Sequence, residues 1–480
     1  MKNILFIASE CVPFIKTGGL ADVAGALPKA LDKSRYDVRV VLPDYTCIPE
    51  KYRSQFEYVN SFQMELGGLG RVYVGIMTCR VEGITYYFID NEHYFGGDKP
   101  YGDLLWDIEK FCFFSKAALS ILPTVGFRPD VIHCHDWQAG LVPVFLHEMF
   151  KDNPFYRGIR TVVTIHNLRF QGVWDIPAMK RFTGLPDRAF TPDRLEFHRD
   201  ANMLKGGLVY ADRITTVSGT YAWEIQQPSF GEGLDGLLRA KSGTLSGILN
   251  GIDYEIYDPV TDRKLYANYD KNGVRQGKAA NKAALQRELA LPEDPEVMMI
   301  GMITRLTDQK GLDLVERVMD WLLTSRIQLV IIGTGDRKYE DLFRRYEWER
   351  KEKVSANIYF NDDRAHKLYA AADAMLMPSL FEPCGLTQLI SLRYGTVPIV
   401  RETGGLKDTV EPYNEYVQTG TGFSFANYNA QEMLDTIFYA ERVFYDARSC
   451  WDAMVRRGME RDFSWRSSAQ AYQALYDQLG

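Results

Sequence analysis

The stretch VMMIGMITRLTDQKGLDLVERVMDWLL, residues 297–323, predicts a buried strand that ends near Arg305 and is followed at once by an amphipathic helix. A short apolar run with polar flanks is typical of a strand in a parallel sheet, and the later apolar residues recur at helical spacing. Arg305 and Lys310 therefore follow the carboxyl end of a strand. Open α/β sheets bind ligands at this edge, and two cations there suit a diphosphate. Two solvated surface cations are the plainer alternative.

The same alternation of strand and helix extends over most of the chain. The first half contains the apolar runs NILFIAS, DVRVVLP, VYVGIM, ITYYFID, DVIHCHD, TVVTIHN and RITTVS. Polar, irregular sequence from residue 253 to residue 295 interrupts them, and a second series follows with VMMIGMITR, LVIIGTGD, NIYF, DAMLMPS and TVPIV. This pattern predicts two α/β domains, each built on a parallel sheet that helices cover.

The composition is that of a globular protein. The chain has 480 residues, of which 46% are hydrophobic and 25% charged, and its formal net charge of −7 gives no general basic field for nucleic acid or an anionic membrane. Its seven cysteines include no C-x-x-C pair, which disfavours a disulfide framework or zinc knuckle and fits a reducing cytoplasm. The start, MKNILFIASE, predicts a buried strand rather than a signal peptide, and no apolar stretch is long enough to span a bilayer.

A glycine pair at a predicted helix start occurs twice, in KTGGLADVAGALPKAL at residues 16–31 and in RETGGLKDTV at residues 401–410. In the first copy the apolar spacing predicts a helix from about Gly18, with a kink site at Pro28. Free backbone N–H groups and missing side chains at such a start let an anion approach, and Lys16 adds a positive charge. A tight turn whose glycines serve packing alone is equally compatible. The pattern is neither a Rossmann dinucleotide fingerprint nor a Walker A loop.

A carboxylate precedes another predicted helix, in PSLFEPCGLTQLISLRYG at residues 378–395. The helix is expected to begin near Gly385, with Glu382 just ahead of it and Thr387 in its first turn. Glu382 could accept hydrogen bonds from sugar hydroxyls, while Thr387 and the nearby amides could bind a phosphate. A carboxylate that merely stabilises the helix start is an equally good explanation for Glu382 alone.

Two strands of the first half end in polar side chains, in VIHCHDW and TVVTIHN. His133, His135 and Asp136 lack the further histidine and the carboxylate-rich partner segment of common metal centres, so their spacing disfavours metal ligation. Asp136 and His166 each follow a buried strand and are expected at the same edge of the sheet. Hydrogen-bonding groups at that edge suit sugar recognition, although a cap for the next helix is the structural alternative.

Taken in order, the motifs resemble those of the bacterial glycogen and starch synthases. The matching segments are KTGGLADV, HCHDWQAG, TIHNLRFQG, LNGID, TRLTDQKGLDL, FEPCGLTQ and RETGGLKDTV, and they span nearly the whole chain. The resemblance implies the GT-B fold, with two Rossmann-like domains around a deep cleft. It implies an acceptor-side domain at residues 1–246, a nucleotide-sugar domain at 247–457, and a final helix within 458–480 that crosses back onto the first domain.

The resemblance also implies an activity and a set of site residues. The activity is transfer of glucose from ADP-glucose to the non-reducing end of an α-1,4-glucan such as glycogen, with retention of configuration. Catalytic roles are implied for His166, Arg305, Lys310, Glu382 and Asp136. Donor binding is implied for Lys16, Gly18, Gly19, Asn250, Cys384, Gly385, Thr387, Gly404 and Gly405, and contacts on the sugar or acceptor side for Asp22 and Tyr94.

The chemistry follows from where charge develops. Departure of the diphosphate leaves an oxocarbenium-like sugar beside a group that gains negative charge, and Lys16, Arg305 and Lys310 can stabilise that charge without a metal ion or other cofactor. Many retaining GT-B enzymes have a second glutamate eight positions after the first, where this chain has Ile390; the synthases generally lack it too. We therefore expect a front-face mechanism, with the two glycine-pair loops facing each other across a cleft that closes.

Several alternatives stay open at the level of sequence. The donor could be UDP-glucose, the acceptor could be glucose 1-phosphate with maltose 1-phosphate as product, or the chain could be a degenerate glucan-binding protein. A phosphorylase is disfavoured because no lysine site for pyridoxal phosphate is recognisable. The backbone near Phe360 and Asn361 is a candidate adenine contact, and NDD at residues 361–363 is expected to cap a helix rather than to bind metal. Oligomeric state is not encoded in these motifs.

Overall fold

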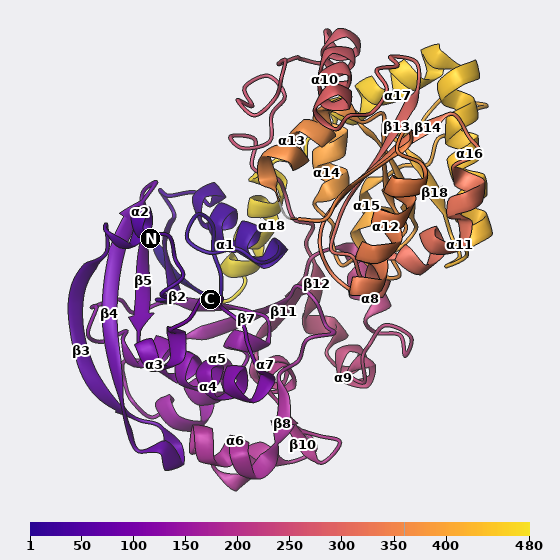
Figure 1. The fold of residues 1–480 in the computed structure, drawn as a ribbon. Coiled ribbons are helices and arrows are strands. Elements are labelled where there is room, and N and C mark those ends of the chain that lie inside the picture. Colours follow the sequence, from indigo (N-terminus) through magenta and orange to yellow (C-terminus); the bar gives the residue numbers. More distant parts are fainter. Residues whose placement is uncertain (360) are drawn as a thin grey trace. The chain divides into compact units, whose positions relative to one another are not determined.

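The computed structural model describes residues 1–359 and 361–480, which form two compact units (Figure 1). Unit 1 comprises Met1–Asn250 and Trp465–Gly480, and unit 2 comprises Gly251–Ser464. Each unit contains a sheet with helices packed on it, as the alternating sequence pattern predicted.

The boundaries lie after Asn250 and Ser464 rather than after residues 246 and 457. Hydrogen bonds explain the difference. The Ser468 hydroxyl donates to the carbonyl of Leu249, which holds the segment after residue 246 within unit 1. The Ile252 amide donates to the carbonyl of Phe463 (2.8 Å), which holds the segment before Ser464 within unit 2.

The sheet of unit 1 has the strand order β12-β11-β7-β6-β1-β2-β5-β4-β3. Its strands are β1 Lys2–Ile7, β2 Tyr36–Pro43, β3 Glu57–Glu65, β4 Arg71–Val81, β5 Ile84–Asp90, β6 Val131–His135, β7 Arg160–Ile165, β11 Arg213–Thr216 and β12 Leu245–Gly247. From β12 to β5 all neighbours are parallel, which confirms the prediction for that part. The pairs β4–β5 and β3–β4 are antiparallel, contrary to it. Only Glu82 and Gly83 join β4 to β5, too short a link for the crossover of a parallel pair.

Unit 1 has helices that pack on this sheet and others that lie farther from it (Figure 1). They are α1 Gly19–Ala30, α2 Glu50–Arg53, α3 Glu92–Phe95, α4 Leu104–Ser120, α5 Leu141–Phe145, α6 Ile176–Thr183, α7 Met203–Tyr210, α8 Gly219–Glu224, α9 Asp235–Ala240 and α18 Trp465–Asp477, with a small sheet of β8 Val173–Asp175, β10 Asp200–Asn202 and β9 Glu196–Phe197. The predicted start of α1 is confirmed, and Pro28 lies inside it. Helix α1 packs on β2, α4 on β5 and α8 on β11, and the last helix, α18, packs on α1.

The sheet of unit 2 is parallel throughout, with the order β15-β14-β13-β16-β17-β18. Its strands are β13 Met298–Ile303, β14 Ile327–Ile332, β15 Val354–Asn357, β16 Ala374–Met377, β17 Val397–Arg401 and β18 Phe423–Phe425. Its helices are α10 Val274–Glu288, α11 Leu312–Leu322, α12 Arg337–Glu349, α13 Asp362–Ala371, α14 Thr387–Arg393, α15 Gly404–Thr409, α16 Ala430–Asp446 and α17 Arg448–Glu460. The strand and helix predicted for residues 297–323 are therefore confirmed as β13 and α11.

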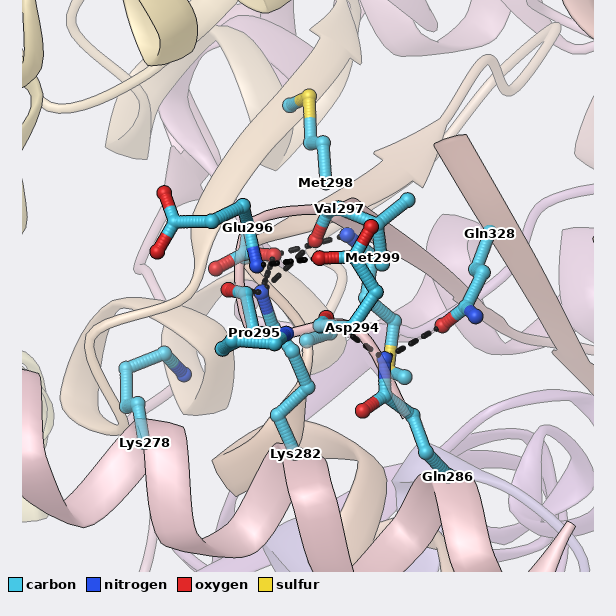
Figure 2. A network of polar contacts seen from close by, with 12 residues as sticks. Lys278, Lys282, Gln286, Asp294, Pro295, Glu296, Val297, Met298, Met299 and Gln328 are labelled. Atoms are coloured by element: carbon cyan, nitrogen blue, oxygen red, sulfur yellow. Dashed lines mark hydrogen bonds and ion pairs between the residues drawn. The ribbon is translucent and has the colours of Figure 1, made fainter. Parts of the chain in front are cut away.

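Helix α10 lies in the segment that the sequence indicated as irregular. Its buried face carries polar side chains at a spacing of four, Lys278, Lys282 and Gln286 (Figure 2), beside the apolar Val274 and Leu285. The Lys282 ammonium lies 2.6 Å from the carboxylate of Asp373, and the Gln286 amide donates to Gln328 (2.8 Å). Because much of this buried face is polar, the hydrophobic periodicity of α10 is too weak to reveal the helix.

The end of β15 also differs from expectation. The run NIYF was predicted as a strand, but β15 ends at Asn357, and Phe360 lies outside the described residues. The proposed adenine contact at Phe360 therefore falls on a residue that the structure does not describe. The Asn361 side chain accepts the Arg364 amide (2.9 Å), which confirms the predicted cap of α13.

In the part of the chain that the structure describes, no helix combines the length and the apolar character that a bilayer crossing requires.

Candidate active site

The loop that precedes α1 is held by Glu10, a residue that the sequence motifs did not single out. Its carboxylate accepts hydrogen bonds from the Thr17 amide and hydroxyl (2.8 Å for the hydroxyl) and from the Gly18 amide (3.3 Å). Tyr101 donates to the same carboxylate (2.8 Å). The expectation of free amides before the helix is therefore wrong for Thr17 and Gly18. The available signal was an acidic residue directly after the buried strand ILFIAS.

Lys16 and Asp22 are brought together by this loop and the first turn of α1. The Lys16 ammonium lies 2.8 Å from the Asp22 carboxylate, and their side chains keep 36% and 20% exposure. Gly18 has extended backbone with φ of −156°, and a Cβ there would meet nothing within 4 Å. Packing alone therefore gives no reason for glycine at this position. The open space beside Gly18 is compatible with close approach of a ligand.

Asp136 and His166 meet at the carboxyl ends of β6 and β7. Oδ1 of Asp136 accepts the His166 amide (2.7 Å), and Asp136 has a positive φ of 56°, which is uncommon away from strained functional positions. Burial raises the pKa of Asp136 to about 7, against the opposing effect of hydrogen bonds from the His166 and Asn167 amides. Burial lowers the pKa of His166 to about 3, so its ring is neutral near pH 7.

The neighbouring His133 belongs to a buried chain of hydrogen bonds. Its Nδ1 lies 2.7 Å from the Tyr476 hydroxyl of α18, and its Nε2 bonds the hydroxyl of Thr164, which lies 2.6 Å from that of Thr215. This chain of hydrogen bonds ties α18 to β6, β7 and β11. Within residues 1–359 and 361–480, no group of three or more His, Cys, Asp or Glu side chains is arranged to hold a metal ion.

Tyr94 and Asn250 are not joined to the Asp136–His166 pair by any contact given for the described residues. The Tyr94 side chain is buried, donates to Glu109 (3.0 Å) and stacks on Phe113. Asn250 is 5% exposed at the end of unit 1, and its Oδ1 has no hydrogen-bond partner among the described residues. An unsatisfied buried amide oxygen is a polar group that a ligand can engage. The roles of both residues stay predictions.

In unit 2, Lys310 and Glu382 form a close ion pair. The Lys310 ammonium lies 2.9 Å and 2.7 Å from the two carboxylate oxygens of Glu382, and the Ser379 hydroxyl donates to Oε2 (2.8 Å). The Lys310 and Glu382 side chains are 17% and 9% exposed. Two residues that the sequence placed on separate motifs thus form one cluster, and Ser379, within the same PSLFEPCG motif, was missed.

The two loops that carry this ion pair are packed closely against each other. Gly311, directly after Lys310, has φ of 74°, and a Cβ there would lie 2.0 Å from the carbonyl of Pro378. The Leu380 amide donates to the Gln309 carbonyl (2.9 Å), which binds the two loops next to the ion pair. Both charged side chains are therefore carried by loops that are bonded to each other.

Arg305 lies five residues before Lys310, but its side chain is more exposed than that of Lys310. It is exposed, and the structure gives its guanidinium no hydrogen bond or ion pair within the described residues. Its backbone carbonyl accepts the Thr307 amide (3.0 Å) in the loop after β13. The prediction that a cation follows the carboxyl end of this strand is confirmed.

The second glycine pair has a packing role that Gly18 of the first pair lacks. Gly404 has φ of 46°, and a Cβ on it would lie 1.9 Å from the Glu382 carbonyl; a Cβ on Gly405 would lie 2.0 Å from the Cys384 carbonyl. The Gly405 amide donates to the Glu382 carbonyl (3.0 Å), so it is not free for a phosphate. These glycines allow α15 to pack directly on the loop that carries Glu382.

The remaining predicted residues of unit 2 follow Glu382. Cys384 is buried, and its carbonyl accepts the Gln388 side-chain amide (2.8 Å). Gly385 has φ of 71°, which favours glycine, and α14 begins two residues later, at Thr387. The Thr387 hydroxyl lies 3.5 Å from that of Tyr369. The helix start expected near Gly385 is thus two residues early.

Two Rossmann-like units, with cations and carboxylates after the carboxyl ends of their strands, define a GT-B glycosyltransferase. Residues 281–442 match the family model described as glycosyl transferases group 1. The structure resembles a sucrose-phosphate synthase from Thermosynechococcus elongatus, with a TM-score of 0.62 and 18% identity over 100% of this chain and 99% of that one, a likeness that supports the fold alone.

The narrower comparisons agree with one another. Residues 3–240 match the starch synthase catalytic domain. A glycogen synthase of Lachnospira eligens is 61% identical over 479 residues, with 100% of each chain covered. The catalytic domain of starch synthase IV from Arabidopsis thaliana, bound to ADP and acarbose, has a TM-score of 0.92 and 33% identity over 100% of this chain and 99% of that one. The chain belongs to the glycogen synthase family and is a glucosyltransferase.

Proposed function

We propose that the chain transfers glucose from ADP-glucose to the non-reducing end of an α-1,4-glucan, with retention of configuration and without a metal ion. The observation that carries this proposal is the Lys310–Glu382 ion pair in the loops after β13 and β16, with the exposed guanidinium of Arg305 on the first of these loops. The starch synthase named above is described as bound to ADP and acarbose, which supports the choice of nucleotide and of glucan.

Lys310 can serve the leaving group while it holds Glu382. A lysine ammonium has three N–H donors, and two of them reach the carboxylate oxygens of Glu382. The third is left for a phosphate oxygen. Because Lys310 is only 17% exposed, its charge is little screened by water and acts strongly on the oxygen where negative charge develops.

Glu382 keeps acceptor capacity for the sugar. Its two oxygens offer about four acceptor positions, and the contacts from Lys310 and Ser379 occupy three of them. A hydroxyl of the donor glucose can take the remaining one. The Gly405 amide fixes the backbone of Glu382, so the carboxylate is positioned before the sugar arrives.

The bond changes follow from these roles. The bond between C1 of glucose and the phosphate oxygen breaks, and ADP leaves with the electron pair. The hydroxyl oxygen of the acceptor glucan forms the new bond to C1 on the same face, and its proton passes to the departing phosphate oxygen. Lys310 and Arg305 stabilise the charge on that phosphate, which is the role a divalent cation plays in other transferases.

Unit 1 supplies a second polar cluster of its own. Asp136 fixes the backbone of His166, and the neutral His166 ring can exchange hydrogen bonds with a glucose hydroxyl. Lys16 lies beside Gly18 and forms a partly exposed ion pair with Asp22. Its ammonium can leave Asp22 and pair with a phosphate instead. We also propose that the enzyme works in the cytoplasm, since all seven cysteines are free thiols.

A transfer assay tests the proposal. Radiolabelled ADP-glucose and UDP-glucose are each supplied with glycogen, or with glucose 1-phosphate, in the presence and absence of a chelator. We expect label in glycogen from ADP-glucose at a rate that the chelator does not change, and the anomeric linkage formed should be α. Preference for UDP-glucose, formation of maltose 1-phosphate, or loss of transfer on chelation would each overturn the corresponding part of the proposal.

A further inference from the structure

His135, for which the motifs implied no role, faces His166 at the end of β6. Its Nδ1 lies 2.9 Å from Nε2 of His166, and its side chain is fully buried. Burial lowers the pKa of both rings, so both are neutral near pH 7. Each neutral imidazole carries one N–H, and a hydrogen bond between the two rings therefore has one donor and one acceptor.

The other nitrogen of His135 decides which ring donates. Nε2 of His135 is buried and has no hydrogen-bond partner among the described residues. A proton on this nitrogen would be a buried N–H without an acceptor, and such orphan donors are rarer in folded proteins than under-satisfied acceptors. The proton of His135 is thus better placed on Nδ1, from which it donates to Nε2 of His166.

This arrangement fixes the other end of His166 as well. Because Nε2 of His166 accepts, the single proton of the neutral ring must be on its Nδ1. We propose that His135 is a positioning residue that holds His166 in the Nδ1–H tautomer, so that His166 presents a hydrogen-bond donor to an oxygen of the bound sugar. The sugar contact rests on the proposed function, whereas the tautomer does not.

The ring of His135 is held in place by stacking. It lies face to face with His133, at 4.3 Å between centroids and 27° between planes, and against Phe6 at 5.3 Å and 23°. His133 is itself bonded at both nitrogens, to Tyr476 and Thr164. His135 therefore cannot turn away from His166 without disturbing a buried stack.

Heteronuclear NMR of the full chain, with nitrogen-labelled histidine, tests the tautomer directly. The His166 signals are assigned by their loss in His166→Gln. In the unliganded wild type we expect Nδ1 of His166 to be protonated and Nε2 to be bare. The His135→Asn variant keeps an N–H donor near the position of Nδ1 and should preserve this state, whereas His135→Leu should shift His166 towards the Nε2–H form.

His366→Asn is the control, since His366 is a buried histidine of unit 2 whose side chain bonds Asp262 and has no contact with His135 or His166 among those given for the described residues. It should leave the His166 tautomer unchanged even if it lowers stability. A wild-type His166 with its proton on Nε2, or a tautomer that His135→Leu does not alter, would overturn the inference. The wild-type spectrum alone shows which nitrogen of His166 carries the proton, even if a variant fails to fold.

Transfer kinetics separate this inference from the proposed function. We expect His135→Leu to lower kcat by about tenfold to a hundredfold with a smaller change in KM for ADP-glucose, and His135→Asn to restore most of it. Equal losses in both variants would contradict a positioning role for the donor. Absence of glucose transfer by the wild type would overturn the proposed function, and the NMR result would still decide the tautomer.

Discussion

A Cβ atom on Gly404 would lie 1.9 Å from the carbonyl oxygen of Glu382, so α15 packs on the loop of Glu382 with no room for a side chain. Gly18, the matching residue of the first glycine pair, is different, since a Cβ there would meet nothing within 4 Å. The two TGGL elements are alike in sequence, but the packing that requires glycine at Gly404 has no counterpart at Gly18.

Gly404→Ala is therefore expected to cost roughly 2–4 kcal/mol of stability, because alanine resists the positive φ and its methyl group clashes with fixed backbone. The displaced Glu382 should also lower kcat. Denaturant unfolding and transfer rates measure the two effects.

Gly18→Ala is the matched control for stability, with an expected cost of no more than about 1 kcal/mol, since its φ of −156° suits any residue. If Gly18→Ala nevertheless weakens donor binding, a ligand must occupy the open space beside it. Equal destabilisation by both substitutions would contradict this difference in packing between Gly18 and Gly404.

Lys310→Ala should lower kcat by about 100- to 1,000-fold, with a much smaller change in donor affinity, because its charge acts most strongly on the departing phosphate. Single-turnover kinetics and equilibrium binding of ADP-glucose separate these quantities. Lys338→Ala removes an exposed lysine that pairs with Asp308 and serves as the control, with rates close to wild type. Unchanged turnover in Lys310→Ala would remove Lys310 from the mechanism.

Asp136→Asn should change how stability depends on pH. The pKa of Asp136 is raised to about 7 in the folded chain, so the folded state binds its proton more tightly than the unfolded state does. The resulting stabilisation is full below the ordinary value of 3.8 and is lost as pH rises through about 7. The stability of Asp136→Asn relative to wild type should therefore improve from about pH 5 to pH 7, by up to about 1.4 kcal/mol per pH unit.

Asp477→Asn provides the contrasting control for this pH series. Hydrogen bonding from Tyr36 lowers the pKa of Asp477, so its contribution is lost only as pH falls below the ordinary range. The stability difference for Asp477→Asn should be flat over the same interval. A flat difference for Asp136→Asn would show that this carboxyl is not held protonated by burial.

Lys282→Met tests the polar face of α10. Its ammonium and the Asp373 carboxylate are almost fully enclosed, at 5% and 7% exposure, so removal of the lysine leaves a buried charge unpaired and should cost about 3–5 kcal/mol. The pair Lys271–Glu460 is 53% and 55% exposed, and Lys271→Met should cost only about 0–1 kcal/mol. Thermal and denaturant unfolding compare the two, and similar costs would argue against a structural role for the polar face.

Sequence patterns predicted most strands of both sheets because apolar runs of the right length are local signals. Two of their failures have different reasons. The antiparallel direction of β4 against β5 has a local signal, the two-residue link Glu82 and Gly83, which the alternation of strands and helices did not reveal. Helix α10 has no such local signal, because it buries lysines and a glutamine whose partners, such as Asp373 and Gln328, lie far along the chain.

In the candidate site, too, some residues were predictable from local sequence and others were not. Lys310, Asp136 and His166 were predicted after strand ends and Glu382 just ahead of a helix, and these places along the chain are confirmed. Glu10, which holds the loop of Lys16, could not be predicted because an acidic residue after a strand is common and its bonds to Thr17 and Gly18 depend on how the loop folds back.

The sequence by itself determined the alternation of strands and helices, the family, and which charged residues follow the carboxyl ends of strands. These depend on spacing over a few residues. Only the tertiary structure decided that Lys310 meets Glu382, 72 residues away, and that His135 faces His166, 31 residues away. Such pairs form because separate strands bring their ends to one edge of a sheet, which no local pattern specifies.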